Sequence, residues 1–309
     1  MRNFILGLSI IIIVALVLVT YLYQKQEAVT LRTGEIQQTE LDDVQQSNPL
    51  YPSTDEQVSY SLQEDTLHLT YNDGADWVEV PIEKEALFAG EYQGNQEELI
   101  EGSFLLTEDH AAFLYSVATE QGSDLVRVGV KETRDQGETW GDHVVVEEIS
   151  PIRFRKLRFV NDTFGYVILS MGRTMSQEYS AVYVTEDGGE NWRATTELPS
   201  TRMIGFGGFV DEMTGFLSYG TINPEEPDVY VTQDMGETWI QSEFQIPEEY
   251  ERIFVQAEVP TKEADHLSVL VNQGPNGDYE GGHIKGEFIS EDNGLNWEFL
   301  KEVEPNEAE

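Results

Sequence analysis

The chain contains no cysteine. This excludes a disulfide framework, a thiolate nucleophile and any cysteine-ligated metal site. Basic residues are also scarce, since 18 Lys and Arg stand against 58 Asp and Glu, for a formal net charge of −40. Nucleic acids and anionic lipid surfaces would be repelled by this charge, so neither is an expected partner. Solubility in a saline or alkaline exterior explains the charge most simply. Recruitment of cations or of a basic partner is the alternative.

Sequence motifs of several enzyme classes are missing as well. The five histidines, at positions 68, 110, 143, 266 and 283, show neither an H-E-x-x-H pattern nor a shared short spacing, which argues against a zinc site. No G-x-S-x-G elbow and no phosphate-binding loop occurs. Asn276, Asp278 and Glu280 lack the regular spacing of a calcium-binding loop. We therefore expect no metal and no cofactor.

A predominantly apolar run of 20 residues, 4–23, lies near the N-terminus. At about 1.5 Å per residue it matches the roughly 30 Å hydrocarbon core of a bilayer. A cleaved signal peptide is the rival interpretation, but the run is long and no small-residue cleavage site follows it. We predict a single-pass signal-anchor at 4–23, a cytoplasmic N-terminus at 1–3, and a flexible acidic and Gln-rich stalk at 24–54. The rest of the chain is then extracytoplasmic, ending in an acidic tail at 305–309.

Every tryptophan ends a copy of one motif, Ser/Thr-x-Asp-x-Gly-x-x-Trp, which recurs every 47 to 62 residues. A tight turn between two strands explains each position. The Ser/Thr and Asp side chains accept backbone N–H groups, the glycine supplies a positive φ, and the tryptophan folds over the turn as the next strand begins. The first copy, residues 71–77, is one residue short. An internal repeat of this period indicates a propeller or a solenoid.

The residues assigned to this turn are Asp73, Gly74, Trp77, Asp135, Gly137, Trp140, Asp187, Gly189, Trp192, Asp234, Gly236, Trp239, Asp292, Gly294 and Trp297. They resemble the Asp box of the sialidase-type, or BNR, repeat over roughly residues 57 to 304. The resemblance implies an all-β propeller in which the box is a structural turn away from the catalytic pocket. A second repeat precedes the boxes, as in Phe159–Gly165 and Phe209–Gly215. Its spacing is more similar to assembly-factor and sortilin-type propellers, which bind proteins or peptides, than to sialidases.

The two repeats together predict four-stranded antiparallel blades, A-B-C-D, in a propeller domain at 55–304. Blades 2 to 5 are expected at about 103–148, 152–198, 203–246 and 253–304. Blade 1 shows three strands, 58–62, 66–71 and 77–82, and its fourth would come from the stalk, from 84–92 or from the C-terminus, because an open edge invites mispairing. The count is five blades, or six if one blade lacks the motif.

Function is expected on the face opposite the repeated turns, where the B–C loops are long and unlike one another. These loops and the crossover before blade 3 are expected to bring arginine, carboxylate, amide and phenol groups toward one mouth. The candidate ligand-binding residues are Arg153, Arg155, Arg173, Asn223, Glu225, Asn276, Asp278 and Tyr279. The competing interpretation is that these are solvated loops and a polar strand face.

A sialidase clamps its substrate with three arginines and uses a Tyr–Glu nucleophile with an Asp acid/base. The Arg-Ile-Pro motif that such enzymes carry before the first box is missing, and Pro151-Ile152-Arg153 has those letters reversed. No catalytic residue can be assigned. We therefore expect a membrane-anchored propeller that binds a protein, a peptide or a cell-envelope glycan. A sialidase-like glycoside hydrolase is the alternative, and the oligomeric state stays open.

Overall fold

The computed structural model describes residues 50–54, 56–63, 65–120 and 124–304. The predicted anchor at 4–23, most of the stalk and the tail at 305–309 lie outside these residues. Within the described ranges, no helix is both long and apolar enough to cross a bilayer.

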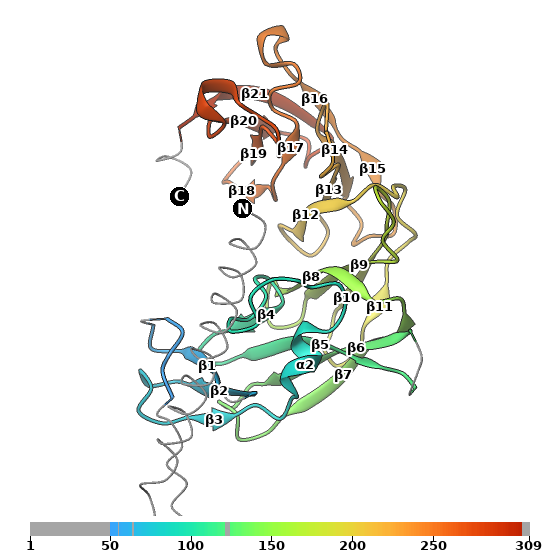
Figure 1. The fold of residues 1–309 in the computed structure, drawn as a ribbon. Coiled ribbons are helices and arrows are strands. Elements are labelled where there is room, and N and C mark those ends of the chain that lie inside the picture. Colours follow the sequence, from blue (N-terminus) through green and yellow to red (C-terminus); the bar gives the residue numbers. More distant parts are fainter. Residues whose placement is uncertain (1–49, 55, 64, 121–123, 305–309) are drawn as a thin grey trace, which may run out of the picture. The chain divides into compact units, whose positions relative to one another are not determined.

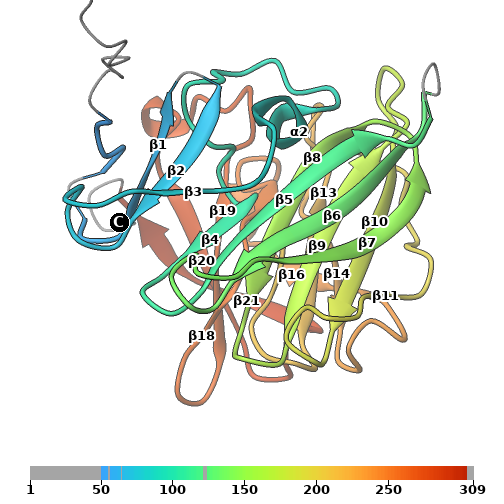
Figure 2. The same ribbon diagram turned by 90° about the horizontal axis from the view of Figure 1, so that it is seen from below.

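Nearly all of the described secondary structure is β-strand, arranged as five sheets that follow one another in chain order (Figures 1 and 2). We call them blades 1 to 5. Blade 1 contains β1 (Ser59–Gln63), β2 (Thr66–Thr70) and β3 (Val78–Glu79). Blade 2 contains β4 (Phe104–Leu106), β5 (Ala111–Ala118), β6 (Val126–Thr133) and β7 (Gly141–Ile149). Blade 3 contains β8 (Ile152–Phe159), β9 (Gly165–Met171), β10 (Tyr179–Thr185) and β11 (Arg193–Ala194).

The last two blades differ from each other in strand number. Blade 4 contains β12 (Ile204–Phe209), β13 (Gly215–Tyr219), β14 (Asp228–Thr232) and β15 (Ile240–Gln241). Blade 5 contains β16 (Glu243–Gln245), β17 (Gln256–Ala257), β18 (Thr261–Lys262), β19 (Leu267–Asn272), β20 (Lys285–Ser290) and β21 (Asn296–Val303). Three short helices complete the described structure: α2 (Lys84–Phe88), η1 (Glu248–Tyr250) and η2 (Tyr279–Gly281).

Hydrophobic clusters lie between successive blades and hold them together. One joins Leu114 of blade 2 to Leu169 of blade 3, another joins Val182 of blade 3 to Leu217 of blade 4, and a third joins Val231 of blade 4 to Phe288 of blade 5. The central strands are therefore covered on both faces, and β9 is buried along its whole length. This explains why its sequence is mostly apolar and does not alternate between polar and apolar residues. The described residues have the successive-blade architecture of a β-propeller.

The structure corrects three expectations about the blade edges. Residues 84–88, considered as a fourth strand for blade 1, form the helix α2. The C-terminal strand β21 pairs with β20 and β16 of its own blade and does not complete blade 1. Residues 243–245, expected within blade 4, cross to blade 5 and pair in parallel with β21. Blade 1 has three strands among the described residues.

The repeated turns have the hydrogen bonds that their residue types predict. In the turn at 185–192, Thr185 Oγ1 donates to Asp187 Oδ1 over 2.8 Å and accepts from Gly189 N over 2.9 Å. The same Asp187 oxygen accepts from Asn191 N over 2.9 Å, which closes the turn. Gly189 has a φ of +104°, a region that residues with a Cβ adopt only at a cost. Equivalent bonds recur at Thr133, Thr232 and Ser290.

The first copy of the turn is complete, not one residue short. Thr70 Oγ1 donates to Asn72 Oδ1 over 3.1 Å and accepts from Gly74 N over 2.8 Å, while Asp76 N donates to Asn72 Oδ1 over 2.9 Å. Asn72 therefore takes the aspartate position that the sequence assigned to Asp73. An amide oxygen accepts the same backbone N–H bonds as a carboxylate, so the turn tolerates the exchange.

The five turn tryptophans are not equally buried. Trp297 is completely buried, whereas the other four are partly exposed. The difference follows from β16, because Phe244 stacks on the Trp297 ring with centroids 5.7 Å apart and planes 12° apart. Prediction from the motif alone gave all five rings the same environment, since the covering strand comes from outside the repeat.

Candidate functional site

The candidate site is a pocket formed by the B–C loops of blades 4 and 5, on the face opposite the repeated turns. It has a cavity volume of about 160 Å³. Four of the predicted residues line it, namely Asn223 from the loop after β13 and Asn276, Asp278 and Tyr279 from the loop after β19. Two loops that are about 50 residues apart in the sequence are thus brought together by the adjacency of their blades.

Direct hydrogen bonds fix the two loops to each other and to their strands. Asn276 Nδ2 donates to Asn223 Oδ1 over 2.9 Å, which bridges the blades. Gln273 Nε2 donates to the carbonyls of Tyr279 and Ile284, each over 2.9 Å, and its Oε1 accepts from Tyr279 N over 2.9 Å. Because Gln273 is only 6% exposed, these bonds are shielded from water and hold the longer loop in one shape.

Tyr279 forms a rigid wall of the pocket. Its hydroxyl donates to Glu302 Oε1 over 2.8 Å, and its ring packs edge-on against Tyr250 and Phe254. The hydrogen bond to Glu302, with burial and the charge of that carboxylate, raises the pKa of Tyr279 to about 12. The phenol is therefore neutral at physiological pH and is held as a donor, so this tyrosine is not an activated nucleophile in the described arrangement.

Arg252 was not singled out in the sequence, yet it lines the pocket. Its Nη2 lies 3.2 Å from Glu225 Oε2, and the two side chains are about three-quarters exposed, at 75% and 74%. An ion pair this exposed contributes little stability, so either side chain can leave the pair and bind a ligand instead. Nothing in its sequence surroundings marks Arg252, because it lies in an irregular segment before β17.

Strained backbone gathers around this pocket. Eight non-glycine residues of the described chain have a positive φ, and four of them belong to the repeated turns. Three of the remaining four, Asn223 (φ 45°), Arg252 (φ 62°) and Glu280 (φ 46°), lie in the segments that surround the pocket. Such conformations cost about 1 kcal/mol or more for residues with a Cβ, and they concentrate where function constrains the chain.

Arg153 and Arg155 lie away from this pocket and are engaged inside the protein. Arg153 binds Glu178 through Nε and Nη2 over 2.5 and 2.6 Å, and Glu178 has a fully buried side chain that also accepts from Ile204 N. Arg155 is 4% exposed and donates to the carbonyls of Leu87 and Ala89 at the end of α2. Burial lowers the pKa of Arg155 to about 10. These contacts give both residues a structural role.

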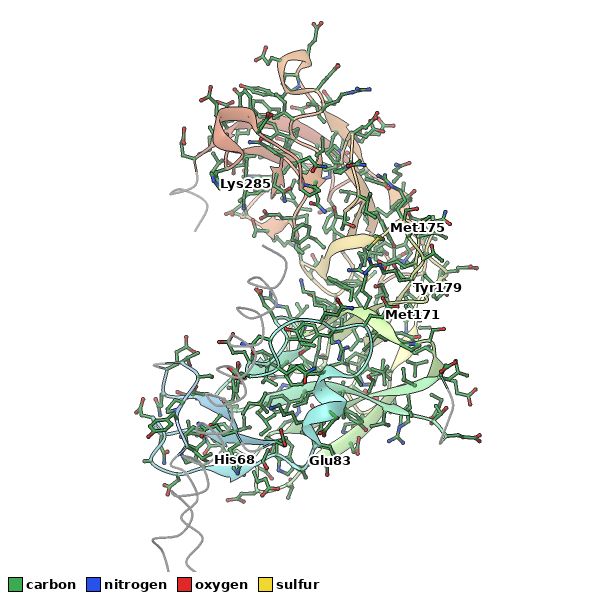
Figure 3. The ribbon with its side chains drawn as sticks, viewed as in Figure 1. His68, Glu83, Met171, Met175, Tyr179 and Lys285 are labelled. Atoms are coloured by element: carbon green, nitrogen blue, oxygen red, sulfur yellow. The ribbon has the colours of Figure 1, made fainter. Side chains whose placement is uncertain are left out.

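Arg173 is exposed on the B–C loop of blade 3 and does not line the pocket. The same loop carries Met175, which is 92% exposed, and Tyr179 begins the strand after it (Figure 3). The sequence therefore grouped residues from three loops and a strand, of which the structure brings together Asn223, Asn276, Asp278 and Tyr279, with Glu225 at the rim.

The lining residues determine what chemistry the pocket can support. Of the three amides in the lining, that of Gln273 is bonded within the loop, which leaves two amides, a guanidinium and a carboxylate that can hydrogen-bond a polar ligand. The proline and isoleucine side chains give apolar contact. Among the lining residues, Asp278 supplies the carboxylate. Glycoside hydrolysis needs two carboxyl groups on either side of one bond. Within the described ranges, no three His, Asp or Glu side chains are grouped so as to hold a metal ion.

Comparison with known proteins found no matching family model and no matching curated protein. Three similar solved structures are a Hadza microbial sialidase, a Penicillium chrysogenum alpha-L-arabinanase complexed with arabinobiose, and a GH43_1 enzyme from Xanthomonas citri. Their identities to this chain are 12%, 14% and 10%, with TM-scores of 0.39, 0.37 and 0.37. The matches cover 65%, 76% and 70% of this chain and 43%, 72% and 75% of those chains, in the same order. Likeness at this level carries no argument about activity.

Proposed function

We propose that this chain is a binding module whose ligand engages the pocket between the B–C loops of blades 4 and 5. The observation that carries this proposal is that residues from two neighbouring blades converge on one cavity. Residues from two blades meet at one cavity, their loops are tied by the Asn276–Asn223 hydrogen bond, and strained backbone surrounds them. A volume of about 160 Å³ is below the range of roughly 300–1,000 Å³ that encloses a whole small molecule. The pocket thus suits one side chain or one sugar ring of a larger ligand.

The location of this module is part of the proposal. The apolar run at 4–23 is long enough to anchor the chain, and the acidic segment after it suits a tether. The loop face would then meet proteins, peptides or glycans of the cell envelope. Protease protection in membrane vesicles tests this arrangement, because an extracytoplasmic blade domain is cleaved from one side of the membrane only.

Glycoside hydrolysis is the second candidate, since Glu225 lies at the rim of a pocket that Asp278 lines. A hydrolase would need both carboxyl groups to face the same bond, one as the acid and one as the base or nucleophile. In the described structure, Glu225 is paired with Arg252 instead. Binding alone requires no such pair and is the function that the geometry supports better.

The test exposes the full-length protein to a panel of oligosaccharides and a panel of short peptides, with binding and turnover measured in parallel. We expect binding without turnover, weakened about tenfold or more by Asn276→Ala and by Asp278→Ala. Glu190→Gln, an exposed carboxylate in the turn at 185–192, is the matched control and should bind as the parent does. Turnover of a fluorogenic sialoside or of any aryl glycoside, lost on Asp278→Asn, would favour the hydrolase.

A further inference from the structure

Two further cavities along the seam of blades 4 and 5 share lining residues with the pocket or with each other. A second cavity of about 350 Å³ shares Arg252 with the pocket, and a third of about 390 Å³ shares Glu226, Phe244 and Ile246 with the second. We call the three together the seam groove. Its lining comes from the segments 223–227, 241–246, 251–253 and 273–279.

Charge and apolar surface are interleaved along the seam groove. Its lining contains five carboxylates, those of Glu225, Glu226, Glu243, Glu251 and Asp278, and one guanidinium, that of Arg252. Between them lie Phe244 and Ile246, which are both partly exposed. An occupant that complements this surface carries positive charges at intervals, with apolar groups in between. The negative potential of the whole chain would draw such an occupant toward it.

The groove also offers backbone groups. Among the described residues, the short strand β16 is the terminal strand of blade 5 and pairs with β21. Just before it, Ser242 N donates to Val229 O of blade 4 over 2.8 Å, so the free part of this edge begins after Ser242. In a parallel pair, alternate residues turn their N–H and C=O toward the partner strand. Because Glu243 N donates to Leu295 O over 2.9 Å, the backbone groups of the next residue, Phe244, face away from β21. An exposed strand edge of this kind accepts an added strand from another chain.

We infer that the seam groove binds an extended, cationic polypeptide segment, with basic side chains over its carboxylates and main-chain bonds to the free edge of β16. This inference rests on the proposed function and names the class of its ligand. One basic side chain would enter the pocket beside Asp278 and displace Arg252 from Glu225. The apolar side chains between the basic ones would cover Phe244 and Ile246. A glycan lacks the backbone N–H and C=O pair that would bond the free groups of Phe244.

The experiment titrates the full-length protein with a short amidated peptide in which lysine and valine alternate. An otherwise identical glutamate–valine peptide and an oligomer of glucosamine, a cationic glycan, are run alongside. We expect the lysine–valine peptide alone to bind, with an affinity that falls as salt is raised. The double variant Glu226→Gln, Glu251→Gln should weaken binding about tenfold, and Glu190→Gln should not. Two further peptides carry N-methyl groups on alternate backbone amides, at odd positions in one and at even positions in the other. One of the two should fail to bind, because its methyl groups replace the N–H groups that bond the strand edge.

Different failures have different meanings. Equal binding of the glucosamine oligomer with the same variant dependence, or indifference to N-methylation, would show that the groove recognises charge and not a polypeptide, which overturns this inference. If the lysine–valine peptide does not bind, the inference is overturned as well. If an oligosaccharide still binds in that case and is lost on Asn276→Ala, the proposed function stands while the peptide inference falls. If no ligand depends on Asn276 or Asp278, the proposed function itself fails.

Discussion

At the residue scale, the arginines divide by what surrounds each guanidinium. Arg153 faces the buried carboxylate of Glu178, Arg155 faces backbone carbonyls, and Arg252 faces solvent. The arginines were expected to lie in the ligand-binding site. A sequence does not show whether a guanidinium already has hydrogen-bond partners within the protein. The hydrogen-bond partners of Arg153 and Arg155 lie 25 to 68 positions away in the sequence, so no local pattern predicts them.

Arg153→Ala should therefore act on stability. It leaves Glu178 charged, fully buried and without its partner, which costs about 3 kcal/mol or more in the free energy of unfolding. Urea denaturation of the full-length protein measures this loss. Arg173→Ala, which removes an exposed guanidinium, should change the free energy by less than about 0.5 kcal/mol. Equal stability of the two variants would contradict the structural role of Arg153.

The five copies of the repeated turn differ at one key position, which is Asn72 in the first copy and aspartate in the other four. At Asp234, the carboxylate accepts from Thr238 N, Thr238 Oγ1 and Thr232 Oγ1. Asp234→Ala should lower the free energy of unfolding by about 1–2 kcal/mol, since it leaves these donors without an acceptor. Asp234→Asn should cost less than half of that. A chemical denaturation series of the three proteins ranks them, and an asparagine variant as unstable as the alanine variant would refute the equivalence.

At the scale of elements, the sequence predicted what repeats and missed what is unique. The turn motif and the strand patterns before it located the strands of blades 2 to 5, because each strand has the residue types that its buried face requires. The helix α2 and the added strand β16 occur once, so no second copy exposes them. β16 has only three residues, and its partner β21 lies about 50 residues later. Pairing over that separation depends on tertiary packing.

The added strand has a measurable consequence for one tryptophan. Phe244→Ala removes the ring that stacks on Trp297 and exposes part of the indole to water. Tryptophan fluorescence should shift to longer wavelength, and the free energy of unfolding should fall by about 2 kcal/mol, less than for a fully buried phenylalanine. Ile240→Ala, on the neighbouring strand and 54% exposed, is the control and should alter neither quantity. An unchanged spectrum for Phe244→Ala would place the shielding of Trp297 elsewhere.

At the scale of the whole molecule, two electrostatic effects oppose each other as the pH falls. Hydrogen bonds from Thr139 and Asn191 hold the pKa values of Asp135 and Asp187 below the usual 3.8. A folded-state pKa below the unfolded one stabilises the protein above about pH 4, and this contribution is lost as protons bind below it. The net charge of −40 acts the other way, because partial protonation of carboxylates relieves self-repulsion.

Thermal stability should therefore rise as the pH is lowered from about 8 to about 5, and fall below about pH 4. Added salt should raise the melting temperature near pH 8 and have a smaller effect near pH 5, since it screens the same repulsion. Calorimetry across pH at two ionic strengths records both trends. A melting temperature that falls steadily from pH 8 downward would show that self-repulsion does not limit this fold.

The loop face carries the central claim, which is that ligand meets the pocket and groove between blades 4 and 5. Hydrogen–deuterium exchange of the full-length protein, with and without the tightest binder from the oligosaccharide and peptide panels, tests this claim most directly. We predict slower exchange in residues 220–227, 243–253 and 272–283, with the repeated turns unchanged. Protection confined to the turns, or to the blade 3 loop that carries Arg173, would contradict the claim.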